Sequence, residues 1–166
     1  MSIYVPTPSL PPGYKNWTDL FGKIYADMQV HTLQRGLVHS LASAGADHLL
    51  YRYRVEFRAQ CADEMLRPEW GVTHTADVPL WFFGNRSTLT ESEKGVAERA
   101  ILGPFTRFVN GEKHVNWGTG GYRDVRTVKS DGRVEIWKDE LWDEALRVWG
   151  ILRAADRGDD GVRSRL

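Results

Sequence analysis

The sequence has a single cysteine, Cys61, among 166 residues, and no excess of charge of either sign. A disulfide bond cannot close within the chain, and a zinc site built from several thiolates is excluded. The 22 basic and 22 acidic residues cancel, so no net field attracts nucleic acid or an anionic membrane surface. Apolar runs are short, and none approaches the ~20 residues that a membrane-spanning helix needs. These absences argue against a disulfide-rich domain, a nucleic-acid-binding protein and a membrane span.

The first residues also lack the features of a secretory signal peptide. Four prolines precede Gly13, and there is neither a basic start nor an apolar core segment. We therefore expect an extended arm over residues 1–16 and, by default, a cytoplasmic protein. The charged, glycine-containing residues 156–166 predict a frayed tail. Between these ends, 42% hydrophobic and 11% aromatic residues are enough to build the core of one folded domain.

A helix is expected over residues 28–44, with Asp27 as its N-cap and Gly45 as its stop. Apolar residues at helical spacing predict its buried face. They are Val30, Leu33, Leu37, Val38 and Leu41. A strand is expected next, over residues 49–57, with alternate side chains on opposite faces. Within it, Tyr51-Arg52-Tyr53-Arg54 favours a buried strand whose arginines extend to solvent, rather than an RNA-binding strand.

A capping box opens the next expected helix, over residues 90–109. Thr90 supplies the N-cap, and Glu93 three residues later completes the box. Pro104 lies inside the span and predicts a kink or an interruption, because proline cannot donate to the preceding turn. Asn110-Gly111 ends the helix.

The remaining elements lie on either side of that helix. Residues 58–79 are expected to be mostly loop. Two β-like runs between residues 122 and 137 flank Ser130-Asp131-Gly132, and Asp-Gly is a strong hairpin signal. A final amphipathic helix is expected over residues 139–154.

The most informative stretch runs from Pro68 to Gly84. A lone histidine, His74, lies in a short loop, Asp77 follows three residues later, and an apolar aromatic run ends at Gly84. This segment resembles the loop that carries the general-base histidine of the type-B carboxylesterases, the cholinesterase-like branch of the α/β-hydrolases.

Further segments resemble the same family in the same order along the chain. They are Ile24-Tyr25-Ala26-Asp27, Leu89-Thr90-Glu91-Ser92-Glu93-Lys94, Phe105-Thr106-Arg107-Phe108-Val109-Asn110-Gly111, and the pair Trp117 and Tyr122. The resemblance covers roughly residues 20–152. It implies an α/β protein with an incomplete α/β-hydrolase fold: the C-terminal part of the sheet, flanking helices and a terminal β-hairpin. Residues 17–155 are accordingly assigned to the C-terminal portion of a carboxylesterase-type domain.

The resemblance implies serine-dependent hydrolysis of carboxylic esters, which needs a serine nucleophile, a base and an acid. In this fold the serine lies in G-x-S-x-G, and the chain order is serine, acid, histidine. None of the eight serines has glycine two residues before and two residues after it. We therefore expect a C-terminal esterase fragment that carries the triad histidine without the nucleophile or the triad acid, and that is inactive alone. The alternative is a non-catalytic interaction module or one subunit of a split protein.

Three residues are candidates for the site. The resemblance makes His74 the catalytic histidine, first a general base and then an acid for the leaving alcohol; the alternative is a histidine whose ring is satisfied by backbone within its loop. Asp77 is either a hydrogen-bond acceptor near that histidine or the cap of a short helix that it starts. Trp70 is a candidate for the wall of a substrate pocket.

No metal and no cofactor are expected. The other histidines lack metal-ligand spacing, and Cys61 has no evident activating partner and is expected to be inert. The expected partners are a small-molecule ester in the complete enzyme, and either an N-terminal esterase portion or a second copy of the chain. Nucleic acid is not expected as a partner.

Overall fold

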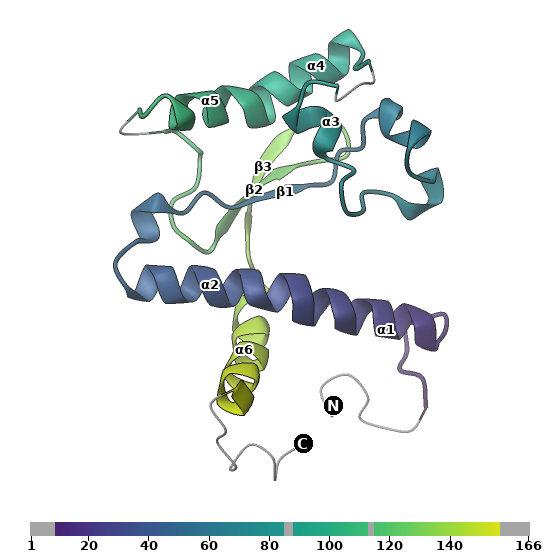
Figure 1. The fold of residues 1–166 in the computed structure, drawn as a ribbon, viewed down its shortest axis with the longest axis vertical. Coiled ribbons are helices and arrows are strands. Elements are labelled where there is room, and N and C mark those ends of the chain that lie inside the picture. The colour runs from purple at the N-terminus through teal and green to yellow at the C-terminus, as the bar shows by residue number, and fades with distance from the viewer. Residues whose placement is uncertain (1–8, 85–87, 113–114, 157–166) are drawn as a thin grey trace. The chain divides into compact units, whose positions relative to one another are not determined.

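The computed structural model describes residues 9–84, 88–112 and 115–156 (Figure 1). Its contacts divide the chain into two units, residues 1–48 with 140–166, and residues 49–139. The first eight residues of the expected arm and residues 157–166 of the expected tail lie outside the described residues. Residues 9–16 form no helix or strand, and the chain turns at Gly13, where φ is +94°.

The first unit contains a helical segment that begins earlier than expected. It consists of α1 (Trp17–Ala26), a π-helical turn (Asp27–His31) and α2 (Thr32–Ser43). The N-cap is Asn16, whose side-chain oxygen accepts from the N–H of Asp19 at 2.9 Å. The prediction of a start at residue 28 is therefore wrong: Asp27 lies inside the helical segment, where it pairs with Lys23 one turn before it. The predicted stop is confirmed, since Gly45 follows the end of α2 with φ +81°.

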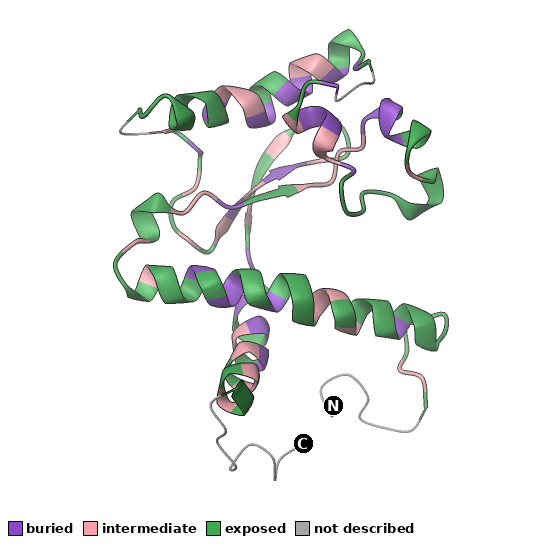
Figure 2. Cartoon of the chain, in the orientation of Figure 1, coloured by how far each residue is buried: buried purple, intermediate pink, exposed green. Residues whose placement is uncertain are grey.

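The buried face of α2 is also not the predicted one. Of the five apolar residues expected to face the core, only Val38 is buried; Val30, Leu33, Leu37 and Leu41 are exposed (Figure 2). The other buried positions of α2 are Thr32, Arg35 and Gly36. The helix α2 packs against α6 (Trp142–Asp156).

Gly36 of α2 lies in close contact with Trp149 of α6. A Cβ atom at this position would lie 2.3 Å from the indole of Trp149, which no side chain tolerates. The indole of Trp149 therefore lies directly against the backbone of α2, and Trp142 at the start of α6 is almost fully buried. The final helix begins at Trp142 rather than at residue 139.

The second unit contains a three-stranded sheet in the order β1-β2-β3, formed by β1 (Tyr53–Val55), β2 (Asp124–Val128) and β3 (Val134–Lys138). β1 is parallel to β2, with Tyr53 opposite Arg126, and β2 is antiparallel to β3. The predicted hairpin is confirmed: Gly132 adopts φ +81° in its turn and donates to the carbonyl of Lys129. The strand expected over residues 49–57 is shorter than predicted.

Arg52 corrects another prediction, because its side chain does not extend to solvent. Its guanidinium is buried and donates to the carboxylate of Asp139 at 2.5 Å and to the carbonyl of Tyr122 at 3.1 Å. The carbonyl of Arg52 accepts from the indole N–H of Trp117 at 2.7 Å. Arg52 thus connects the start of β1 to both ends of the hairpin.

The helix expected over residues 90–109 is present in three parts, α4 (Glu91–Ala97), a π-helical turn (Glu98–Leu102) and α5 (Gly103–Val109). The capping box of Thr90 and Glu93 is confirmed. Pro104 lies in the first turn of α5, so the predicted interruption occurs just before it. Proline cannot donate to the carbonyl of Ala100, four residues earlier. That carbonyl instead accepts from the guanidinium of Arg126, at 2.9 Å.

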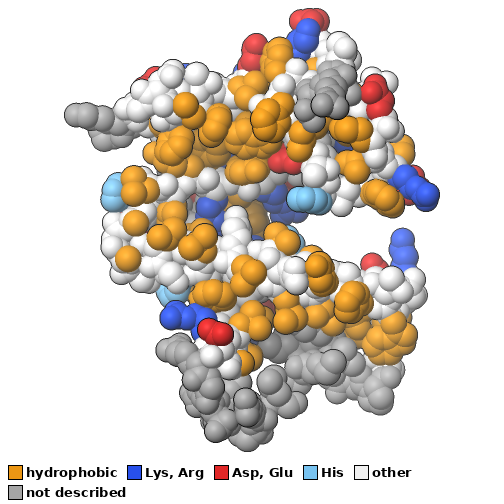
Figure 3. Space-filling view, in the orientation of Figure 1, with side chains coloured by type: hydrophobic (Ala, Val, Ile, Leu, Met, Phe, Trp, Pro, Cys, Tyr) orange, Lys and Arg blue, Asp and Glu red, His pale blue; other side chains and the backbone are white. Residues whose placement is uncertain are grey.

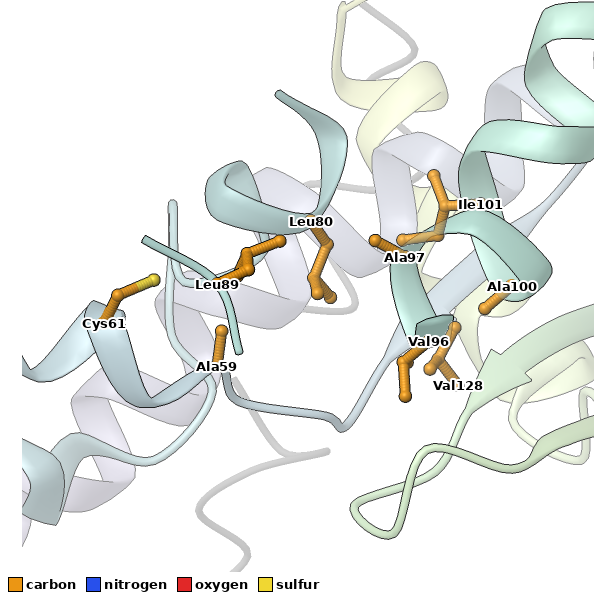
Figure 4. Packing of buried hydrophobic residues seen from close by; sticks show 9 residues of the cluster. All are labelled: Ala59, Cys61, Leu80, Leu89, Val96, Ala97, Ala100, Ile101 and Val128. Atoms are coloured by element: carbon orange, nitrogen blue, oxygen red, sulfur yellow. The ribbon is translucent and has the colours of Figure 1, made fainter. Parts of the chain in front are cut away.

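The rest of the second unit consists of short helices and a hydrophobic core that contains several small side chains. Gln60–Glu64 and Pro68–Trp70 are 3-10 helices, and Val78–Trp81 forms the short helix α3. A further 3-10 turn, Asp47–Leu49, ends at the first residue of the unit. The core contains three alanines among nine residues (Figure 4). They are Ala59, Cys61, Leu80, Leu89, Val96, Ala97, Ala100, Ile101 and Val128.

The two units together give mixed helices with one small sheet, compatible with a partial α/β fold. One edge of β1 pairs in parallel with β2. On the other side, β1 has no neighbouring strand within the described residues. Among those residues, too, every helix is too short or too polar to cross a membrane.

Candidate active site

His74 lies at the centre of a tight turn between the Pro68–Trp70 helix and α3. The N–H of Ala76 donates to the carbonyl of Thr73 at 3.0 Å, which closes the turn around His74 and Thr75. Thr75 has φ +71°, in the left-handed region that β-branched residues avoid at a cost of about 1–2 kcal/mol. The fully buried side chain of Ala76 anchors the turn in the unit, while His74 remains exposed.

An open hollow of about 560 Å³ lies beside this turn. It brings His74 together with Asp77, Tyr53 of β1 and Trp81 of α3. The other lining residues are Thr73, Thr75 and Val78. Within the described part of the chain, the imidazole of His74 has no hydrogen-bond partner.

Asp77 is held by a neighbour on its own helix. Its carboxylate accepts from the indole N–H of Trp81 at 3.1 Å. Asp77 precedes α3 as expected, but its side chain makes no capping hydrogen bond. Burial raises the pKa of the Tyr53 hydroxyl, and the negative charge of Asp77 raises it further. The hydroxyl of Tyr53 is therefore a proton donor in the hollow at neutral pH.

Trp70 is not among the residues that line the hollow. Its side chain is 56% exposed, and the guanidinium of Arg67 lies 5.7 Å from the centre of its ring. Tyr53 and Trp81 line the hollow but were not among the site residues predicted from the sequence. A sequence signal existed for Trp81, since it lies four residues after Asp77 and therefore on the same side of a helix. No local signal places Tyr53, which reaches the hollow through the tertiary position of β1.

The described residues contain no group of three or more histidine, cysteine, aspartate or glutamate side chains that could hold a metal ion. His114, one of the histidines considered above, lies outside those residues. Cys61 is buried in the core, and burial raises the pKa of its thiol above the ordinary value, with Glu93 adding to the effect. A thiol of this kind is a poor nucleophile at neutral pH.

The hollow therefore offers a proton acceptor beside a carboxylate and a phenol. Among the described residues that line it there is no serine, and the hydroxyl groups belong to Thr73, Thr75 and Tyr53. An imidazole in this position can accept a proton from a hydroxyl nucleophile brought to it and return the proton to a leaving group.

Two curated proteins are similar to most of this chain. It is 41% identical over 157 residues to a protein of Gibberella moniliformis named carboxylic ester hydrolase, a match that covers 92% of this chain and 28% of that protein. It is 33% identical over 130 residues to an uncharacterized esterase/lipase of Schizosaccharomyces pombe, covering 78% of this chain and 24% of that protein. No protein-family model and no solved structure matches.

These similarities support an esterase family for the region that this chain shares with the two proteins. The chain spans about a quarter of the length of each of the two relatives. Neither name specifies a type-B or cholinesterase-like branch.

Proposed function

We propose that the chain is the histidine-bearing C-terminal portion of a serine carboxylesterase of the type-B kind, with His74 as its general base. The observation that carries the proposal is the match to a carboxylic ester hydrolase over 92% of this chain and only 28% of that protein. A shared segment of this length, with most of the relative lying outside it, fits one part of an enzyme whose remaining catalytic groups belong to another part.

The surface of the first unit supports the same proposal. Large apolar side chains are exposed along α1, the π-helical turn and α2. They are Trp17, Phe21, Tyr25, Met28, Val30, Leu33, Leu37 and Leu41. Exposed apolar surface on this scale is typical of a face that another protein segment covers. The runner-up function, a non-catalytic interaction module, rests on this surface alone.

In the proposed reaction, the imidazole of His74 takes the proton of a serine hydroxyl as that oxygen attacks the ester carbonyl. The imidazolium then gives this proton to the departing alcohol, and the same sequence with water releases the acid. The serine, the triad acid and the donors that stabilise the oxyanion come from the portion of the enzyme outside this chain. Asp77 lines the same hollow as His74.

A chimera tests this assignment. The matched 157 residues of the Gibberella hydrolase are replaced by the corresponding residues of this chain, and hydrolysis of p-nitrophenyl acetate is measured. We expect His74→Ala to lower kcat by about 10³-fold or more, as loss of a general base does in serine hydrolases. His48→Ala is the matched control, because His48 is also exposed but does not line the hollow, and it should change kcat less than twofold.

Retention of activity by the folded His74→Ala chimera would refute the role of His74. A folded but inactive chimera with His74 intact would instead favour the interaction module. Circular dichroism of both chimeras shows that they are folded.

A further inference from the structure

The loop that carries His74 runs from Gly71 to Ala76 and is held mainly at its two ends. At its far end, the side chain of Ala76 is fully buried. Between the ends, the backbone groups of Val72 and His74 make no hydrogen bond within the described residues. Thr75, directly after His74, has φ +71°, and a strained residue of this kind keeps its conformation only where the surrounding structure fixes it. The start of the loop therefore needs a fixed point of its own.

The guanidinium of Arg58 supplies that fixed point. Its Nη1 donates to the carbonyl of Gly71, and its Nη2 donates to the carbonyl of Leu66 at 2.7 Å. Its Nε donates to the carboxylate of Asp63 at 2.9 Å, and this carboxylate also balances the guanidinium charge. All three guanidinium nitrogens are thus engaged, and the side chain is only 15% exposed. A planar guanidinium suits this site, because it holds its acceptors in fixed relative directions.

Apart from Arg58, the described residues tie the start of the histidine loop only to the short helix just before it. The N–H of Gly71 donates to the carbonyl of Pro68 at 3.0 Å, a bond within one turn of the chain. Gly71 adopts φ +60°, and glycine moves between positive and negative φ without a steric penalty. The contact with the guanidinium therefore connects Gly71 to the sheet, since Arg58 follows the end of β1 by three residues.

A general base must lie within about 3 Å of the proton that it takes. A displacement of ~1 Å at a reacting group can lower a rate about 100-fold. Gly71 is three residues before His74, and no hydrogen bond of Val72 would keep His74 in place if Gly71 moved. The contact between Arg58 and Gly71 is thus the nearest fixed point before the imidazole.

We propose that Arg58 is a positioning residue for His74. It holds the carbonyl of Gly71, and through it the histidine loop, in the arrangement that directs the imidazole to the reacting groups. This inference rests on the proposed function. Arg58 acts through the loop and not on the substrate, since it is not among the residues that line the hollow.

The test uses the chimera of the Gibberella hydrolase that carries this chain. Arg58→Met removes the guanidinium and keeps most of its aliphatic stem. Arg67→Met is the matched control, because Arg67 lies in the same segment but is 72% exposed and reaches Glu69 only at 4.0 Å. Figure 3 shows exposed basic side chains over this segment between β1 and α3. We expect kcat/KM for ethyl acetate to fall about a hundredfold in Arg58→Met and less than twofold in Arg67→Met.

A second ester separates positioning from a general loss of folded enzyme. p-Nitrophenolate leaves without a proton, whereas ethoxide must take one from the imidazolium of His74. In Arg58→Met, kcat/KM should therefore fall at least tenfold further for ethyl acetate than for p-nitrophenyl acetate. Arg58→Lys keeps the charge without the fork of donors, so it should lie between Arg58→Met and the unsubstituted chimera. Should Arg58→Met fail to fold, the same comparison of the two esters in Arg58→Lys decides.

Hydrogen exchange in this full chain gives a result that does not depend on catalysis. The amide of Ala76 is the reporter, because its bond to the carbonyl of Thr73 closes the turn around His74. We expect this amide to exchange at least tenfold faster in Arg58→Met than in the unsubstituted chain, and at the same rate in Arg67→Met.

The possible outcomes separate this inference from the proposed function. Equal losses for the two esters, or equal activity of Arg58→Met and Arg67→Met, overturn the positioning role and leave His74 as the general base. A folded chimera that is inactive with Arg58 and His74 intact contradicts the proposed function. In that case, faster exchange of Ala76 in Arg58→Met alone supports the fixing of the loop by Arg58, and unchanged exchange overturns it.

Discussion

Removing either partner of the Arg52–Asp139 ion pair is expected to destabilise the second unit severely. The two side chains are 4% and 0% exposed, so neither charge is solvated by bulk water, and their closest atoms are 2.5 Å apart. Arg52 also donates to the carbonyl of Tyr122. Asp139→Asn removes the carboxylate charge that this buried guanidinium contacts, and Arg52→Met removes the guanidinium charge that the buried carboxylate contacts. Breaking a buried pair in this way costs about 3–5 kcal/mol.

Native-state hydrogen exchange measures this cost without requiring a single cooperative unfolding step. The amide of Arg126 is the reporter, because it donates to the carbonyl of Arg52. We expect its free energy of opening to fall by about 3–5 kcal/mol in each single variant. The double variant Arg52→Met/Asp139→Leu buries no charge, so it should lose less than the sum of the two single variants.

Two results would refute this reasoning. A loss below about 1 kcal/mol in both single variants would mean that the pair behaves like an exposed salt bridge. Strict additivity in the double variant would mean that the two side chains act independently of each other. Arg133→Met is the control, since Arg133 pairs with Asp131 while largely exposed and should cost far less.

Three further predictions concern the isolated chain. It should not hydrolyse p-nitrophenyl acetate above an imidazole background, because it lacks a G-x-S-x-G serine; saturable turnover that disappears in His74→Ala would contradict this. It should bind the dye ANS and associate at micromolar concentration through its exposed apolar residues, and a monomer by light scattering without dye fluorescence would argue against this. Burial alone would raise the pKa of Glu93, but hydrogen bonds from Gln60 and Thr90 outweigh it and lower the pKa. Since a lowered folded-state pKa stabilises the protein above the unfolded value, the start of α4 should lose exchange protection as pH falls below about 4.5, and Glu93→Gln should remove this pH dependence.

Local rules predicted those elements whose determinants lie within a few residues. The capping box of Thr90 and Glu93 and the turn at Gly132 depend only on neighbouring groups, and both are present. The start of the first helical segment was missed because Asp27 and Asn16 are both good caps, and the pairing of Asp27 with Lys23 inside the helix favours the earlier start. Periodicity identified the apolar face of α2 but could not show that this face stays exposed in the described structure.

The residues of the candidate site were likewise predicted only in part. The loop sequence located His74 and Asp77, and the structure places both in one hollow. Tyr53 comes from a strand about twenty residues earlier, so only the tertiary fold brings it there. Trp70, close to His74 in sequence, does not line the hollow, and the positive-φ Gly71 lies between the two residues. The role of Trp70 in a substrate pocket stays a prediction.

The contact between Gly36 and Trp149 has a consequence for the lifetime of the chain. A helix with an apolar face could hide that face by rotating about its own axis toward α6. The indole against the backbone of Gly36 prevents this, because rotation would bring a Cβ atom from another position into the space that only glycine leaves open. The apolar face of α2 therefore stays outward for as long as α2 and α6 remain packed.

Exposed apolar surface of this kind is what chaperones and proteases recognise in cells. We expect the chain to be degraded rapidly when it is produced alone and to persist when a partner covers α2.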